Sequence, residues 1–132
     1  MIHLEEALSA YNKKHKLSLT VENVDNSYRF YTKREKQVVK VGEIELIRNR
    51  SNCGVIDLHS LWGNTPKDID LILSFMKDFA KVGGRNILTY NTSSDQPELR
   101  KSLKKAGFSS PRTKYKNKNS GNFITFHVLA VK

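Results

Sequence analysis

The chain has 132 residues, of which 38% are hydrophobic and 27% charged, and its formal net charge is +10. A chain of this size and composition can bury a core without disulfides or metal, so we expect one globular domain over residues 1–132. No apolar run approaches the roughly 18 residues of a membrane helix, which excludes a membrane-spanning protein.

The first half of the chain predicts one helix followed by three strands. Leu4, Leu8 and Tyr11 lie at helical spacing and indicate a helix over residues 3–16. Alternating and aromatic residues then favour strands over residues 27–33, 37–48 and 54–62, which are separated by polar turns. These three strands predict an antiparallel meander.

The second half begins with a well-marked helix. Thr65 is a candidate N-cap, Pro66 suits the first helical position, and Asp68 completes a capping box. Gly83 and Gly84 end the helix, and its apolar stripe is expected to pack into the core. A strand over residues 86–90, a helix between Pro97 and Gly107, and strands over residues 108–115 and 122–131 complete the prediction.

Cysteine, histidine and the N-terminus bear on location and metal binding. Cys53 is the only cysteine, so an internal disulfide and a multi-cysteine zinc site are excluded. The histidines show no metal-ligand spacing, and we expect no metal. Glu5 and Glu6 stand where a signal peptide carries positive charge, so we expect a cytoplasmic protein.

This order of elements, with two local motifs, resembles the GNAT acetyltransferase superfamily. The motifs are Gly83-Gly84-Arg85-Asn86-Ile87-Leu88 after the long helix, and Asn91 followed by Lys105-Ala106-Gly107-Phe108. The resemblance covers about residues 27–131, without a visible first strand. It implies an α/β (α+β) fold with a mixed, mostly antiparallel sheet, a central parallel crossover and flanking helices.

The resemblance also implies an acetyl-CoA-dependent N-acyltransferase, with a cofactor site where the third predicted strand meets the long helix. The residues that it points to are Leu61, Trp62, Gly63, Asn64, Lys67 and Asn91. This junction departs from the family's glycine-rich loop, which holds a pyrophosphate through free backbone N–H groups. Pro66 lacks an N–H, Thr65 is a cap, and Asp68 adds negative charge. We therefore expect an altered site.

Candidate catalytic residues are Asp57, His59 and Tyr90. Leu103 occupies the position of the tyrosine that protonates the leaving thiolate in many family members, and Tyr90, at the end of the preceding strand, is the candidate to replace it. Asp57 and His59 lie two residues apart on one strand, where they could act as a general base. The alternative is that all three residues have structural roles.

The C-terminal part is strongly basic. Nine Lys or Arg residues and no acidic residue follow Glu98. Four of them alternate along a predicted strand and a fifth residue there is aromatic: Arg112, Lys114, Tyr115, Lys116 and Lys118. Such a row can follow phosphates, so a non-catalytic module that binds nucleic acid or an acidic protein is the alternative function. A charged edge that prevents aggregation explains the row equally well. The oligomeric state is not predicted.

Overall fold

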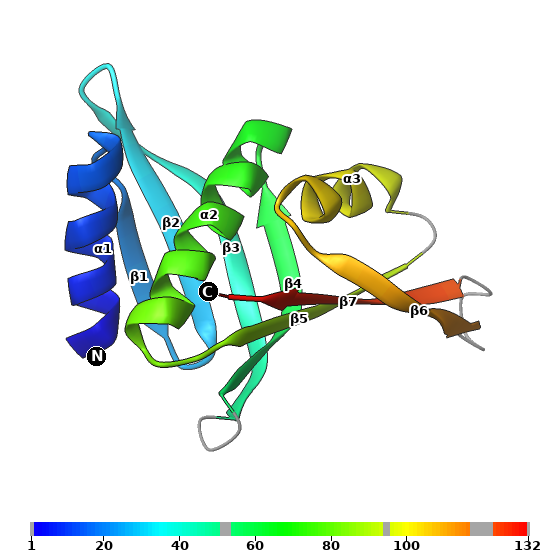
Figure 1. Cartoon of the computed structure of the whole chain (residues 1–132). Helices are drawn as coiled ribbons and strands as arrows, with labels where there is room; N and C mark the ends of the chain where they lie inside the picture. Colours follow the sequence, from blue (N-terminus) through cyan, green and yellow to red (C-terminus); the bar gives the residue numbers. More distant parts are fainter. Residues whose placement is uncertain (1, 51–53, 94–95, 117–122, 132) are drawn as a thin grey trace.

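Seven strands form one mixed sheet in the order β1-β2-β3-β4-β5-β7-β6 (Figure 1). This computed structural model describes residues 2–50, 54–93, 96–116 and 123–131. The elements in chain order are α1 (Ile2–His15), β1 (Thr20–Val24), β2 (Ser27–Arg34), β3 (Gln37–Arg50), β4 (Val55–Gly63), α2 (Pro66–Val82), β5 (Ile87–Ser93), α3 (Pro97–Lys105), β6 (Ser109–Lys116) and β7 (Phe123–Ala130). Among these strands, β4 and β5 pair in parallel and the other neighbours pair antiparallel. The predicted sheet with a central parallel crossover is confirmed.

Strand β1 is an element that the sequence analysis did not predict. It forms an antiparallel hairpin with β2, from the pair Thr20 and Tyr31 to the pair Val24 and Ser27. Asp25 in the turn has a φ of 54°, a left-handed conformation that aspartate tolerates better than most residues. The hairpin places β1 at one edge of the sheet.

The three helices lie side by side on one face of the sheet (Figure 1). Between helices and sheet lies one apolar core, whose largest fully buried side chains include Phe30, Ile44, Leu58, Phe75 and Met76. On the other face, Glu22, Arg29, Glu43 and Trp62 are successive partners in a row across β1 to β4. In the part of the chain that the structure describes, no helix covers this second face, which we call the open face.

Helix α2 begins as its capping signals predict. The Asp68 backbone N–H donates a hydrogen bond to the Thr65 hydroxyl at 3.2 Å, and Pro66 occupies the first helical position. The helix starts very close to the end of β4, since a Cβ at Gly63 would lie 2.6 Å from Ile69 Cγ1. Gly63 is therefore needed for the close packing of α2 against the sheet.

Candidate functional site

Strands β4 and β5 separate at the centre of the sheet. Their parallel pairing ends at Leu58 and Tyr90, whereas β4 continues to Gly63 and β5 to Ser93. Figure 1 shows the two strands diverging, with α3 drawn in the angle between them. The β4 backbone beyond Leu58 thus has no strand partner on the side of β5, and we call this region of separation between the two strands the gap. The carboxyl ends of neighbouring parallel strands are a common position for ligand sites.

Tyr90 joins the two strands where they separate. Its side chain lies on the helix side of the sheet and is only 4% exposed. Burial raises the pKa of the Tyr90 hydroxyl, and a hydrogen bond with the Leu61 backbone partly lowers it. The Tyr90 hydroxyl therefore lies next to the Leu61 backbone. Tyr90 therefore remains protonated at neutral pH and contacts the free backbone of β4.

A histidine lies next to Tyr90 on the same buried face. His127 of β7 is the cross-strand partner of Tyr90, and its Nε2 is 2.7 Å from the Thr92 hydroxyl oxygen. Burial lowers the pKa of His127, and the nearby Arg100 guanidinium of α3 lowers it further. The imidazole is therefore neutral at neutral pH. Perturbed titratable groups that gather at a strand end are typical of functional sites.

These groups form what we call the buried polar cluster: the Leu61 backbone and the side chains of Tyr90, Thr92, Arg100 and His127. Two of them, Leu61 and Tyr90, were predicted from the sequence. His127 was missed because neither its distance along the chain nor its neighbours indicate that it faces Tyr90. That pairing comes from the antiparallel register of β5 and β7.

Asp57 and His59 lie away from Tyr90. Asp57 accepts a 2.5 Å hydrogen bond from the hydroxyl of Thr89, its partner on β5. Since Asp57 and Thr89 are paired one position before Leu58 and Tyr90, their side chains point to the open face. The three predicted catalytic residues thus lie on two faces of the sheet.

His59 occupies an irregular position in β4. The register passes from the pair Glu45–Ser60 directly to the pair Leu46–Leu58, so His59 is the extra residue of a bulge. Its side chain is 62% exposed, and its Nε2 lies 4.0 Å from a carboxylate oxygen of Glu45. Glu45 was not singled out from the sequence, although Glu43 and Glu45 alternate with apolar residues there.

The residues predicted to hold a cofactor lie at the same end of the sheet, but some of them are already bonded. The Asn64 side chain donates to the Lys40 carbonyl at 2.7 Å, and its backbone N–H donates to Val41 at 2.9 Å. Lys67 is exposed in the first turn of α2. Asn91 is exposed on β5, opposite Phe126. Trp62 is half exposed on the open face.

A carboxylate occupies the first turn of α2. Asp68 is 2% exposed and forms a 2.9 Å ion pair with Arg34 at the end of β2. The Thr65 side chain accepts a hydrogen bond from one backbone N–H of the first turn, and Pro66 has no N–H to offer, as the sequence predicted. This end of α2 therefore already holds a negative charge inside the protein, together with its own cation.

The predicted row of cations falls at the far edge of the sheet. Arg112, Lys114, Tyr115 and Lys116 belong to β6, which pairs with β7, and Lys118 lies outside the described residues. Leu103, at the position of the family's acidic tyrosine, is completely buried in α3.

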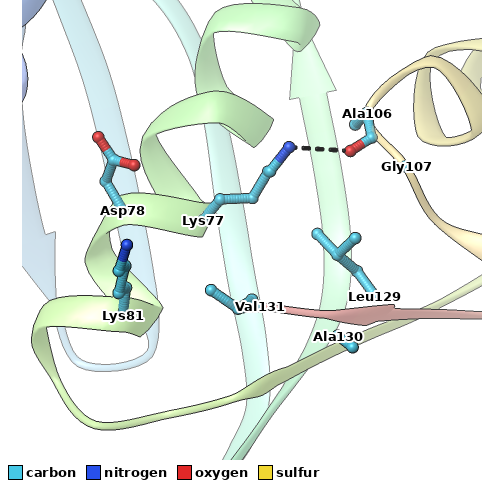
Figure 2. A pocket seen from close by; sticks show the side chains of 8 residues that line it. All are labelled: Lys77, Asp78, Lys81, Ala106, Gly107, Leu129, Ala130 and Val131. Atoms are coloured by element: carbon cyan, nitrogen blue, oxygen red, sulfur yellow. Dashed lines mark hydrogen bonds between the residues drawn. The ribbon is translucent and has the colours of Figure 1, made fainter.

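A separate hollow of about 330 Å³ lies between α2, the end of α3 and the end of β7 (Figure 2). Lys77 extends across it and donates a 3.0 Å hydrogen bond to the Ala106 carbonyl, which is at the C-terminal cap of α3. Leu129 and Val131 line its apolar part. This hollow faces the C-terminal half of α2, away from the gap that follows Leu58. The hydrogen bond from Lys77 in this hollow joins α2 to the end of α3.

Two kinds of feature are absent from the parts of the chain for which there is a structure. No helix there is long and apolar enough to cross a membrane. Within the same residues, no group of three or more His, Cys, Asp or Glu side chains could hold a metal ion.

Comparison with solved structures gives many matches that share one fold, whereas no family model and no curated sequence matches the chain. A GNAT-family acetyltransferase from Bacillus anthracis has 11% identity and a TM-score of 0.64, over 80% of this chain and 66% of that one. A Bacillus subtilis acetyltransferase in complex with CoA has 9% identity and a TM-score of 0.65, over 88% and 99%. The spermidine N-acetyltransferase SpeG of Vibrio cholerae, as an F149A mutant, has 10% identity and a TM-score of 0.65, over 95% and 74%. The chain therefore has the GNAT fold.

Proposed function

We propose that the protein is an acetyl-CoA-dependent N-acyltransferase with an atypical cofactor site. The observation that carries this proposal is the contact between the Tyr90 hydroxyl and the Leu61 backbone at the point where β4 and β5 separate. It places a backbone N–H donor and a protonated hydroxyl next to each other in a buried position. The GNAT fold and the CoA-bound structural neighbour support the same chemistry.

Acyl transfer to an amine needs three groups from the protein, and the chain offers a candidate for each. Acetyl-CoA supplies the acyl carbon as a thioester. When the thioester is bound, its carbonyl oxygen would replace the Tyr90 hydroxyl as the partner of the Leu61 N–H, which would donate to it as negative charge develops there. Tyr90 would give its proton to the sulfur as the carbon–sulfur bond breaks, and His59 on the open face would take the proton that the amine loses. Asp57 is the second candidate base.

The buried polar cluster supports this role for Tyr90 through its charge state. His127 faces Tyr90 across the β5–β7 pair and is fixed by Thr92. Since the imidazole is neutral, it adds no positive charge that would favour the phenolate of Tyr90. A neutral, buried tyrosine is suited to donate a proton to a thiolate and poorly suited to lose one to water.

The first turn of α2 does not fit the diphosphate of the cofactor. Thr65 caps one N–H, Pro66 has none, and Asp68 buries a negative charge where an anion would approach. We therefore propose that acetyl-CoA binds weakly, through its pantetheine arm near Leu61 and Tyr90, with Trp62, Gly63, Lys67 and Asn91 nearby.

Thermal unfolding with acetyl-CoA and a transfer assay with a panel of primary amines test the proposal. A ligand at 100 times its dissociation constant raises the free energy of unfolding by about 2.7 kcal/mol, which is several degrees in melting temperature. Tyr90→Phe should lower the rate of transfer about 100-fold or more while the fold is retained. Tyr28→Phe is the matched control, because Tyr28 is equally buried but lies on β2, two strands away from Leu61. No stabilisation by millimolar acetyl-CoA and no transfer would contradict the proposal.

A second candidate function is a non-catalytic contact with nucleic acid or an acidic protein. The observation that favours it is the basic surface of α3, where the exposed Lys101 and Lys104 line a hollow of about 310 Å³ together with the partly buried Arg100. In the sequence the basic row of β6 follows directly. This function needs the fold but not the cofactor.

A further inference from the structure

The open face carries a hollow of about 290 Å³ lined by Lys40, Glu43, Ser60 and Trp62, which we call the Trp62 hollow. Glu43 and Trp62 are cross-strand partners on β3 and β4, and Trp62 is 50% exposed. The hollow therefore combines an indole ring, a carboxylate and a hydroxyl on a rigid part of the sheet. Its fourth wall is a lysine.

Lys40 places a cation in this hollow. The Lys40 ammonium lies 5.6 Å from the centre of the Trp62 ring and donates a 2.7 Å hydrogen bond to Glu43. An ammonium group over an indole ring, with a carboxylate beside it, is the arrangement by which proteins bind organic cations. The hollow thus already holds a cation, and that cation belongs to the chain itself.

The contact made by Lys40 is weak enough to be replaced. Its side chain is 40% exposed, and exposed ion pairs contribute little to stability because water screens them. Lysine also has a long stem, and it can move its ammonium into solvent without a change in the backbone. Glu45 lies on the same face of β3, opposite Ser60, and adds a second carboxylate near the hollow.

We infer that the Trp62 hollow binds an organic cation of the alkylammonium class, and that Lys40 is the internal cation that this ligand displaces. The ligand's ammonium group would take the place of the Lys40 ammonium between Trp62 and Glu43. Binding does not depend on acyl transfer. The use of such a cation as the acyl acceptor, in contrast, depends on acyl transfer and so rests on the proposed function. Because Trp62 directly follows Leu61, the hollow adjoins the gap from the open face.

Trp62 is the only tryptophan of the chain, so intrinsic fluorescence reports on this hollow alone. The probe is n-butylammonium, a copy of the lysine side chain, compared with uncharged 1-butanol at constant ionic strength. We expect a saturable change in Trp62 emission with n-butylammonium and none with 1-butanol. Equal responses to the two compounds, or no response to either, would overturn the inference.

Two substitutions should change the affinity in opposite directions. Lys40→Met removes the internal cation and keeps the stem, so n-butylammonium should bind about tenfold tighter, which corresponds to about 1.4 kcal/mol. Glu43→Gln should weaken binding by a similar factor. Lys40→Arg keeps the charge and should bind like the parent protein, and Lys33→Met, an exposed lysine on β2, should change nothing.

The direction of the Lys40→Met effect decides between ligand classes. If the hollow bound an anion through Lys40, Lys40→Met would abolish binding of acetate and would not tighten binding of n-butylammonium; this result would overturn the inference. Acetyl-CoA is absent from every arm of the experiment. A protein that binds n-butylammonium as expected but transfers no acyl group would contradict only the proposed function.

Discussion

The Arg34 guanidinium and the nearly buried Asp68 carboxylate form a 2.9 Å ion pair that fixes the end of β2 against the first turn of α2. Arg34→Met would leave Asp68 buried without this cation. We expect the free energy of unfolding to fall by about 1–2 kcal/mol, between the values for exposed and buried pairs, because Arg34 is half exposed. Arg29→Met, which removes exposed pairs with Glu22 and Glu43, is the control and should cost less. Equal losses in urea unfolding would contradict this assignment.

The cap of α2 gives a second prediction. Thr65→Ala should lower the free energy of unfolding by about 1 kcal/mol, because the Asp68 N–H loses its hydrogen-bond acceptor. Ile72→Ala, in the core side of the same helix, should cost about 2–5 kcal/mol. Both are measured by urea unfolding. A silent Thr65→Ala that tightens acetyl-CoA binding would mean that this end of α2 is an open anion site.

His127 should make stability depend on pH. Burial lowers its pKa below the ordinary value of 6.5, so the unfolded chain takes up this proton at a higher pH than the folded chain. The free energy of unfolding should therefore fall as the pH drops below about 6.5, by at most about 1.4 kcal/mol per pH unit, until the folded-state pKa is passed.

His127→Gln should make this decline shallower between pH 7 and pH 5, measured as melting temperature against pH. His59→Gln is the matched control, because it removes a histidine whose side chain is 62% exposed rather than buried. If His127→Gln and the parent protein decline in parallel, other groups cause the pH dependence.

The bond across the hollow of Figure 2 gives a fourth prediction. Lys77→Met keeps the apolar stem but removes the hydrogen bond to Ala106 and a cation at the C-terminal end of α3. The expected loss is about 1 kcal/mol in the free energy of unfolding. Lys81→Met removes a second lysine that lines the same hollow and is exposed, and it should cost less than half as much.

The basic C-terminal region should show whether nucleic acid is a partner. In a mobility-shift assay, affinity should fall with salt, with a log–log slope of about −0.9 per phosphate contact on duplex or −0.7 on single strands. Replacing Lys114, Lys116 and Lys118 by Ser should make the slope less steep by the amount that corresponds to about three phosphate contacts. The control replaces Lys13, Lys14 and Lys16 of the N-terminal region, an equal loss of charge. No shift at low salt and micromolar protein would exclude this function.

The sequence predicted nine of the ten elements because each has a local signal. The cap at Thr65, the apolar stripe of α2 and the alternation around Ile44 all arise from near neighbours in the chain. Strand β1 was missed since Thr20–Val24 is short and three of its five residues, Thr20, Glu22 and Val24, are exposed. Its strand structure comes from pairing with β2 rather than from its own pattern.

The candidate site was harder to predict because it depends on register. Asp57 and His59 look equivalent by period two, but the bulge at His59 gives them different partners, Thr89 and Glu45. Tyr90 was identified, whereas its neighbour His127 is 37 positions away and meets it only through the β5–β7 ladder. Sequence periodicity assigns a face to a side chain but cannot assign its partner on another strand.

The short junction between β4 and β5 has a consequence for how the chain folds. On one side of it, β1 to β4 are joined by hairpins between neighbours in the sequence, and β6 and β7 are also consecutive. The parallel pairing at this junction joins Val55–Leu58 to Ile87–Tyr90, two segments that are separated along the chain by the whole of α2. Closing such a loop costs more entropy than forming a hairpin, so we expect the two parts of the sheet to form first and to dock late. The gap beside Tyr90 then comes into existence only at the last step of folding, when α2 settles across the two parts.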